Sequence, residues 1–147
     1  MRSILSVLLM LMMGSLPAWA ALGGDVASVT SDVQVLRGQH TMVAKTGFTL
    51  HQITSSDGSV VNEFVSPAGV VFGVSWQGHF VPNLKQLLGS YATNLQQGQR
   101  TEVIPRHAVT IQGDNFMLSS FGHGRSFRGR AVVPGLVPAN LTPEVVQ

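Results

Sequence analysis

The sequence has no cysteine, few charged residues and few long apolar runs. Without cysteine, no disulfide can form in an oxidising compartment and no lipid can be attached to a cysteine at the start of a mature chain. Charged residues make up 11% of the chain and the formal net charge is +2, so nothing predicts nucleic acid binding. After residue 20, no apolar run reaches the length of a membrane span. The fold must therefore depend on packing alone.

Residues 1–20 have the pattern of a cleaved signal peptide. Arg2 gives a positive start, residues 4–13 are apolar, and residues 18–20 form the cleavage pattern A-x-A. The apolar run is too short for a membrane anchor, which needs roughly 18 residues. We expect cleavage after Ala20 by a Sec-type route and a periplasmic or secreted protein.

The remaining residues are enough for one domain with its own core. We expect an α+β domain at 21–133, in which an antiparallel meander of about five or six strands packs against one main amphipathic helix at 82–97. Residues 25–36 fit both a helix and a strand, with a slight preference for the helix. Residues 134–147 are rich in proline and are expected to form a loosely ordered tail.

Short runs with strand composition, separated by turn sequences, predict the sheet. The turns at the start of the meander are SSDGS and SPAG, and later ones are Gly113-Asp114-Asn115 and Gly122-His123-Gly124. The last of these precedes a strand rather than a helix, so we interpret it as a turn and not as a phosphate loop. The candidate strands are 48–53, 60–66, 70–76, 107–112, 116–121 and 127–133.

The turn SPAG predicts a register for the hairpin around it. Pro67 suits the first central position of a type I turn, and Gly69 can take the left-handed conformation that follows. With this loop, Phe64 would lie opposite Phe72. One face would then hold the apolar residues Val70, Phe72, Val74 and Trp76, and we expect this face to be the core.

The turn SSDGS allows two registers, which differ by one residue and exchange the two faces of the strand. A two-residue loop at 57–58 would place His51 opposite Phe64 in the core. A three-residue loop at 56–58 places His51 opposite Glu63 instead. We prefer the second register because it places apolar residues opposite apolar ones and polar residues opposite polar ones. It puts His51 and Glu63 on the face away from the helix.

The main helix is predicted from an apolar stripe with Asn83 as N-cap and Gln86 in the capping-box position. Gly89 lies off this stripe, where glycine costs about 0.5–1 kcal/mol relative to alanine. Either the helix breaks there or a partner packs closely, and we expect a contact surface around Gly89 and Thr93. The stripe consists of Leu84, Leu87, Leu88, Tyr91, Ala92 and Leu95.

Four stretches carry a family resemblance: ALGGDVASV, SPAGVVFGVSWQG, PNLKQLLGSY and FRGRAVV. They resemble short exported proteobacterial proteins known only as domain of unknown function family 2844. The resemblance covers nearly all of the chain after residue 20 and implies an exported single-domain protein. It implies no catalytic residue. Where relatives tend to have proline after WQG, this chain has His79.

His51 and Glu63 are the candidate catalytic pair, because a carboxylate can orient an imidazole for acid and base chemistry. A cross-strand pair of this kind is also an ordinary feature of a half-exposed sheet. The serines near the best motif, Ser75 and Ser90, do not fit the G-x-S-x-G pattern of a nucleophile. The five histidines lack H-x-H and H-x-x-x-H spacings, so we expect neither a metal nor a cofactor.

Arg128 and Arg130 would share one face of a strand and form the main charge cluster together with Arg125. They suit an anionic lipid, an acidic polysaccharide or an acidic envelope protein. They also suit a solvated edge strand.

The leading hypothesis from the sequence is an exported, non-catalytic binding or accessory module of the bacterial envelope. Two alternatives stay open. One is a hydrolase-like enzyme that uses His51 and Glu63, and the other is an oligomeric structural subunit.

Overall fold

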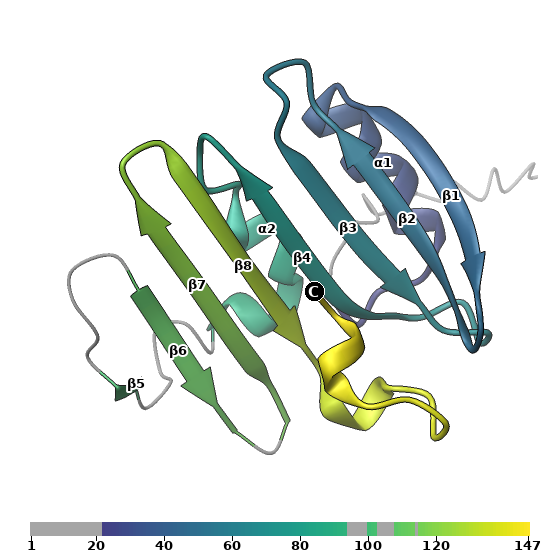
Figure 1. Cartoon of the computed structure of the whole chain (residues 1–147). Coiled ribbons are helices and arrows are strands. Elements are labelled where there is room, and N and C mark those ends of the chain that lie inside the picture. The colour runs from purple at the N-terminus through teal and green to yellow at the C-terminus, as the bar shows by residue number, and fades with distance from the viewer. Residues whose placement is uncertain (1–21, 94–99, 103–107, 114) are drawn as a thin grey trace, which may run out of the picture.

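The computed structural model describes residues 22–93, 100–102, 108–113 and 115–147, so the predicted signal peptide lies outside the described residues. The described strands form one antiparallel sheet of eight in the order β1-β2-β3-β4-β8-β7-β6-β5. In Figure 1 the helices α1 and α2 lie behind this sheet and the yellow C-terminal segment lies in front. The strands are β1 (Gln39–Lys45), β2 (Phe48–Thr54), β3 (Val60–Val65), β4 (Val71–Gly78), β5 (Arg100–Glu102), β6 (Ala108–Gln112), β7 (Met117–His123) and β8 (Ser126–Val132). The helical elements are α1 (Ala27–Leu36), α2 (Leu84–Leu88), η1 (Gly89–Thr93), η2 (Pro134–Leu136) and η3 (Pro143–Val145).

The α+β class is confirmed at this level, but the predicted numbers of strands and helices are wrong. The sheet has more strands than five or six, and two short helices cover it instead of one long helix. The stretch that suited both a helix and a strand is α1, so the preference for a helix is confirmed. No helix in the described part of the chain is long and apolar enough to cross a membrane.

The helix predicted at 82–97 is interrupted after five residues. Asn83 is the N-cap, and its side chain accepts a hydrogen bond from the backbone N–H of Gln86. α2 ends at Gly89, which has φ 51° and ψ −124°, a conformation that favours glycine. The chain then continues as the 3₁₀ helix η1. The conformation at Gly89 explains why glycine occurs there, so no packing partner is needed to explain it. Residues 94–97 of the predicted helix lie outside the described ones.

The register predicted for β2 and β3 is confirmed, with His51 opposite Glu63. The SPAG turn also forms, since Gly69 has φ +78° and the Ser66 N–H donates to the Val70 carbonyl. The register predicted between β3 and β4 is wrong, because an irregularity between Phe64 and Val65 shifts the pairing by one residue. Phe64 therefore lies opposite Gly73.

This shift exchanges the faces of β4 relative to β3. Val74 lies opposite Glu63 and Trp76 opposite Val61, so these residues share the helix-covered face. The prediction that His51 and Glu63 lie away from the helices is therefore wrong. Gly73 and Ser75 of β4 occupy the other face.

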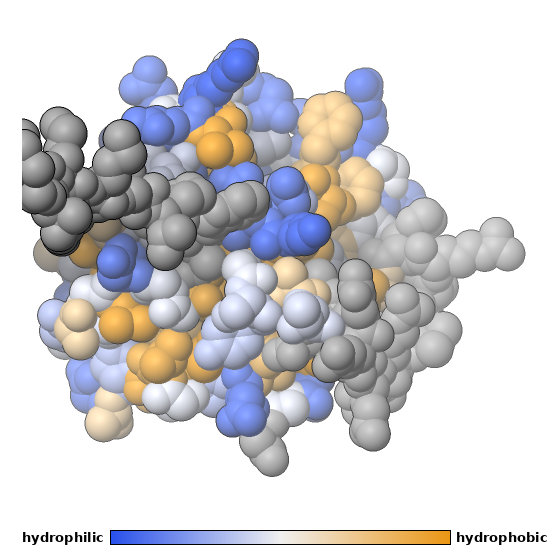
Figure 2. All heavy atoms as spheres, turned by 180° about the vertical axis from the view of Figure 1, so that it is seen from behind, coloured by the Kyte–Doolittle hydropathy of each residue, from blue (hydrophilic) through white to orange (hydrophobic). Residues whose placement is uncertain are grey.

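The core has two parts, one on each face of the sheet. The helix-covered face, shown in Figure 2, buries the larger cluster, which includes Val29 of α1, Leu87 and Leu88 of α2, and Trp76 of β4. A second cluster on the front face consists of Phe64, Phe72, Val132 and Val146, with partly buried apolar residues around it.

Residues 134–147, here named the C-terminal segment, complete the second cluster rather than forming the loosely ordered tail that was expected. Val146 is 0% exposed and packs over Gly73, where any side chain would meet it. The Arg130 guanidinium donates to the Val146 carbonyl at 3.0 Å, and the Ser75 hydroxyl donates to the Gln147 oxygen at 2.7 Å. The segment is therefore an integral part of the fold.

Candidate functional site

A continuous row of polar side chains crosses the front face of the sheet, one from each of seven strands. Each member lies opposite the next in the register of neighbouring strands. Neighbouring strands lie about 4.8 Å apart, so the row places polar groups at a regular spacing. Ser75 at its centre is 4% exposed, so the accessible groups of the row lie on either side of it. We name it the polar row, and in sheet order it consists of Thr41, Gln52, Asn62, Ser75, Arg130, Ser119 and Thr110.

Hydrogen bonds connect the first half of the polar row. The Gln52 amide donates to the Asn62 side chain at 3.0 Å, and the Asn62 amide donates to the Ser75 hydroxyl at 3.2 Å. The Ser75 hydroxyl in turn donates to the Gln147 oxygen. These contacts hold Gln52, Asn62 and Ser75 in defined orientations.

Side chains alternate between the two faces along β8, so Arg128 and Arg130 both lie on this face. Arg130 lies between Ser75 and Ser119 in the polar row. Arg128, two residues earlier on the same strand, lies between Gln77 and Phe121. Arg128 and Phe121 are exposed, whereas Arg130 is half-buried. The prediction that Arg128 and Arg130 share a face is confirmed.

Two depressions flank Arg130 and hollow this part of the face. The first has a volume of about 320 Å³ and is lined by both arginines, Asn62, Ser75 and Phe121, among others. The second has a volume of about 250 Å³ and extends over β6 and β7 toward η3. Both are lined by Ser119, Phe121 and Arg130, and together they form a groove that follows the polar row from Asn62 to Thr110.

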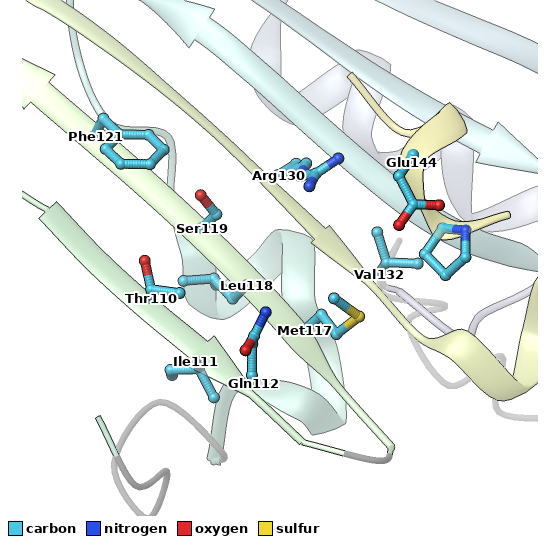
Figure 3. A pocket seen from close by; sticks show the side chains of 11 residues that line it. Thr110, Ile111, Gln112, Met117, Leu118, Ser119, Phe121, Arg130, Val132 and Glu144 are labelled. Atoms are coloured by element: carbon cyan, nitrogen blue, oxygen red, sulfur yellow. The ribbon is translucent and has the colours of Figure 1, made fainter. Parts of the chain in front are cut away.

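Figure 3 shows the second depression. Ser119 and Thr110 line it from β7 and β6, and Arg130 projects from β8 between Ser119 and Glu144 of the C-terminal segment. A hydrogen bond from the Thr142 side chain lowers the pKa of Glu144, and the charge of Arg130 adds a smaller effect in the same direction. Glu144 is therefore ionised at neutral pH and borders the basic part of the groove.

A second polar cluster lies on the opposite face, buried beneath the helices. Glu63 and Asp32 are each 1% exposed, and the Gln86 amide donates to Asp32 at 2.6 Å. In the predicted capping box, the Gln86 side chain would bond the backbone N–H of Asn83. In the structure it bonds Asp32 of α1 instead. The cluster joins α1, α2 and β3.

Glu63 holds a proton at neutral pH. Burial is the main cause that raises its pKa to about 9, and the hydrogen bond and the charge of the nearby Asp32 carboxyl contribute to the same rise. As an ionised carboxylate, Glu63 would leave both of its buried oxygens without a donor among the described residues. In the protonated form it can donate to Asp32, whose own pKa is raised by burial. Burial therefore raises the pKa of both acids, and the shift is large enough to keep Glu63 protonated at neutral pH.

His51 lies opposite Glu63 on the same face but contacts a different residue. Its Nδ1 is 3.1 Å from Nε2 of His40, and the two rings stack with centroids 5.2 Å apart. Burial lowers the pKa of His51, and the charge of His40 lowers it further. The predicted catalytic pair thus becomes two separate contacts, His51 with His40 and Glu63 with Asp32. With Glu63 1% and His51 5% exposed, a substrate has almost no access to either side chain.

The other candidates from the sequence have local structural roles in the described chain. Thr93 donates from its hydroxyl to the Ser90 carbonyl at 2.9 Å. Gly124 has φ +60° in the turn between β7 and β8. Among the described residues, no three His, Asp or Glu side chains gather as a metal site would require.

Sequence reasoning missed the polar row and the Asp32 contact. Both depend on pairings between distant segments, such as β4 with β8 and α1 with β3, and local sequence patterns carry no signal for them.

Comparison with known proteins gives one match. A family model described as "Protein of unknown function (DUF2844)" matches residues 18–146. Searches of curated proteins and of solved structures returned no match.

Proposed function

The chain belongs to the DUF2844 family of proteins of unknown function, and from this premise we propose that it is a non-catalytic binding module of the bacterial envelope. Its ligand is an acidic polysaccharide that lies along the polar row. The observation that carries this proposal is the row itself, a line of hydroxyl, amide and guanidinium groups with a groove beside it.

The chemistry of the groove suits a sugar chain with carboxylate groups. Amide and hydroxyl side chains such as Asn62 and Ser119 can both donate to and accept from sugar hydroxyls. Arg128 and Arg130 match carboxylates, because a guanidinium can bond both carboxylate oxygens at once. Phe121 is 45% exposed beside Arg128 and offers an apolar ring face for a sugar to cover. A stable protein partner would instead bury about 800 Å² on each side.

The buried cluster favours a binding module over a hydrolase. A general acid or base must come within hydrogen-bond reach of its substrate. His51 and Glu63 lie on the helix-covered face and are 5% and 1% exposed, and the His51 ring nitrogen is bonded to His40. We therefore assign these residues to the stability of the fold.

Calorimetric titration with an oligomer of galacturonic acid tests the proposal. We expect saturable binding that weakens as salt is added, because the ionic contacts are partly exposed. Arg128→Gln should weaken binding about tenfold or more, the loss typical of a charged hydrogen bond. Lys45→Gln removes a charge of the same sign from β1, outside the groove, and should leave the affinity unchanged.

Two results would overturn this function. One is an Arg128→Gln protein that binds the oligomer as tightly as the Lys45→Gln control. The other is equal affinity for a neutral oligosaccharide, which would show that the arginines do not select the ligand.

Export is the second element of the proposal. It is supported by the signal pattern in residues 1–20, and mass spectrometry of periplasmic and medium fractions tests it. A chain that begins at Ala21 in either fraction is the expected product. Full-length protein confined to the cytoplasm would contradict export.

A structural subunit that assembles through β1 is a second candidate function. Every residue of this edge strand is exposed, and such an edge can pair with another strand. Light scattering of the purified protein distinguishes the two functions, because the binding module requires no assembly and the subunit does.

A further inference from the structure

One end of the molecule combines protruding apolar side chains with cations. Phe80 and Val81 lie in the connection between β4 and α2, and they are 63% and 43% exposed. The turn between β7 and β8 lies beside this connection and carries the exposed Arg125. At the same end, seen at the upper right of Figure 2, apolar side chains protrude next to hydrophilic ones.

The two loops are held together. Nδ1 of His79 is 3.0 Å from the Arg125 carbonyl oxygen, and Gly78 lies opposite Phe127 in the sheet. The position of Phe80 relative to Arg125 is therefore set by a hydrogen bond and by strand pairing. We name residues 79–81 and 122–126 together the tip.

The charge of the tip is positive in the described part of the chain. Arg125 and the neighbouring Arg128 are both exposed. The acid at this end is Asp57 of the β2–β3 turn, whose carboxylate accepts from the Ser59 N–H at 2.9 Å and from the Ser59 hydroxyl at 3.0 Å. These bonds lower the pKa of Asp57, so it is ionised, and the two arginines outnumber this one carboxylate.

We propose that the tip docks on the surface of an anionic lipid bilayer. Two adjacent apolar side chains are too small an area for a stable protein interface, which buries about 800 Å² on each partner. They suffice for shallow insertion at the lipid boundary when cations beside them meet anionic headgroups. Arg128 borders both this contact and the groove, but Phe80, Val81 and Arg125 line neither depression of the groove, so variants at these three residues test the tip alone.

Vesicle sedimentation tests the docking. Protein that begins at residue 21 retains the whole described fold and lacks the apolar run 4–13, which would bind lipid by itself. We expect it to bind vesicles of phosphatidylcholine with 30% phosphatidylglycerol and to bind pure phosphatidylcholine much less. Added salt should weaken the binding.

Two variants identify the parts of the tip. Phe80→Ser combined with Val81→Ser should weaken binding about tenfold or more, given the cost of losing two inserted apolar groups. Arg125→Gln should weaken it about threefold to tenfold. The matched controls are Val35→Ser, which changes a valine of 59% exposure on α1, and Lys45→Gln, and both should bind like the parent.

The docking would be overturned if the parent protein failed to bind anionic vesicles. It would also be overturned if the Phe80 and Val81 variant bound as well as the Val35→Ser control. Titration of that variant with the galacturonic acid oligomer separates this inference from the proposed function, because loss of the tip should leave the groove affinity unchanged.

Discussion

Replacement of Glu63 by glutamine should change how the stability of the protein depends on pH. Glutamine keeps the shape of the side chain but has no carboxyl group to titrate. The pKa of Glu63 is about 9 in the folded protein, compared with 4.5 as its ordinary value. Between these values the folded state binds the proton more tightly than the unfolded state, so stability falls as pH rises.

The magnitude follows from this difference. Between pH 4.5 and about 9, each rise of one pH unit lowers the parent's free energy of unfolding by about 1.4 kcal/mol through this group. The total over the window is at most about 6 kcal/mol, comparable to the whole stability of a small domain. Glu63→Gln removes this slope. The free energy of unfolding of the variant, relative to that of the parent, should therefore rise steadily from pH 5 to pH 9.

Urea unfolding followed by circular dichroism at each pH measures the effect. The control is Glu144→Gln, because Glu144 is exposed and its pKa is lowered rather than raised. The control should keep the parent's alkaline loss of stability. If the Glu63→Gln and parent curves ran parallel from pH 5 to pH 9, Glu63 would not hold a proton in the folded protein and this reasoning would be refuted.

Two further predictions concern the fold. Val146→Ala should lower the free energy of unfolding by about 1.5–3 kcal/mol, because the side chain is completely buried, and a thermal melt unchanged from the parent would show that the segment does not contribute to the core. Gly89→Ala should destabilise the protein by about 1–3 kcal/mol, because φ is 51° and ψ is −124° there. Urea unfolding measures it, and a more stable variant would mean that α2 continues through this position.

The sequence predicted the elements that depend on neighbouring residues. The SSDGS turn and the pairing of like with like were sufficient for the β2–β3 register. Alternation along one strand was sufficient to place Arg128 and Arg130 on one face. The cap at Asn83 was also predicted correctly, because capping depends on the next few residues.

The failures come from features without a local signal. The SPAG turn determines the Ser66–Val70 pair, but the bulge that follows depends on packing on both faces of the sheet. One shifted residue then moved His51 and Glu63 from the expected exposed face to the buried one. The C-terminal segment was misjudged because its prolines suggested disorder, whereas its apolar side chains cover the front of the sheet.

Mapping of the bound oligosaccharide by NMR shows whether the ligand lies along the polar row. Amide chemical shifts are followed while the galacturonic acid oligomer is added to labelled protein that begins at residue 21. We expect the largest changes on β8 and β7, around Arg128, Arg130 and Ser119. Changes concentrated on the helix-covered face around His51, or no changes at saturating oligomer, would contradict it.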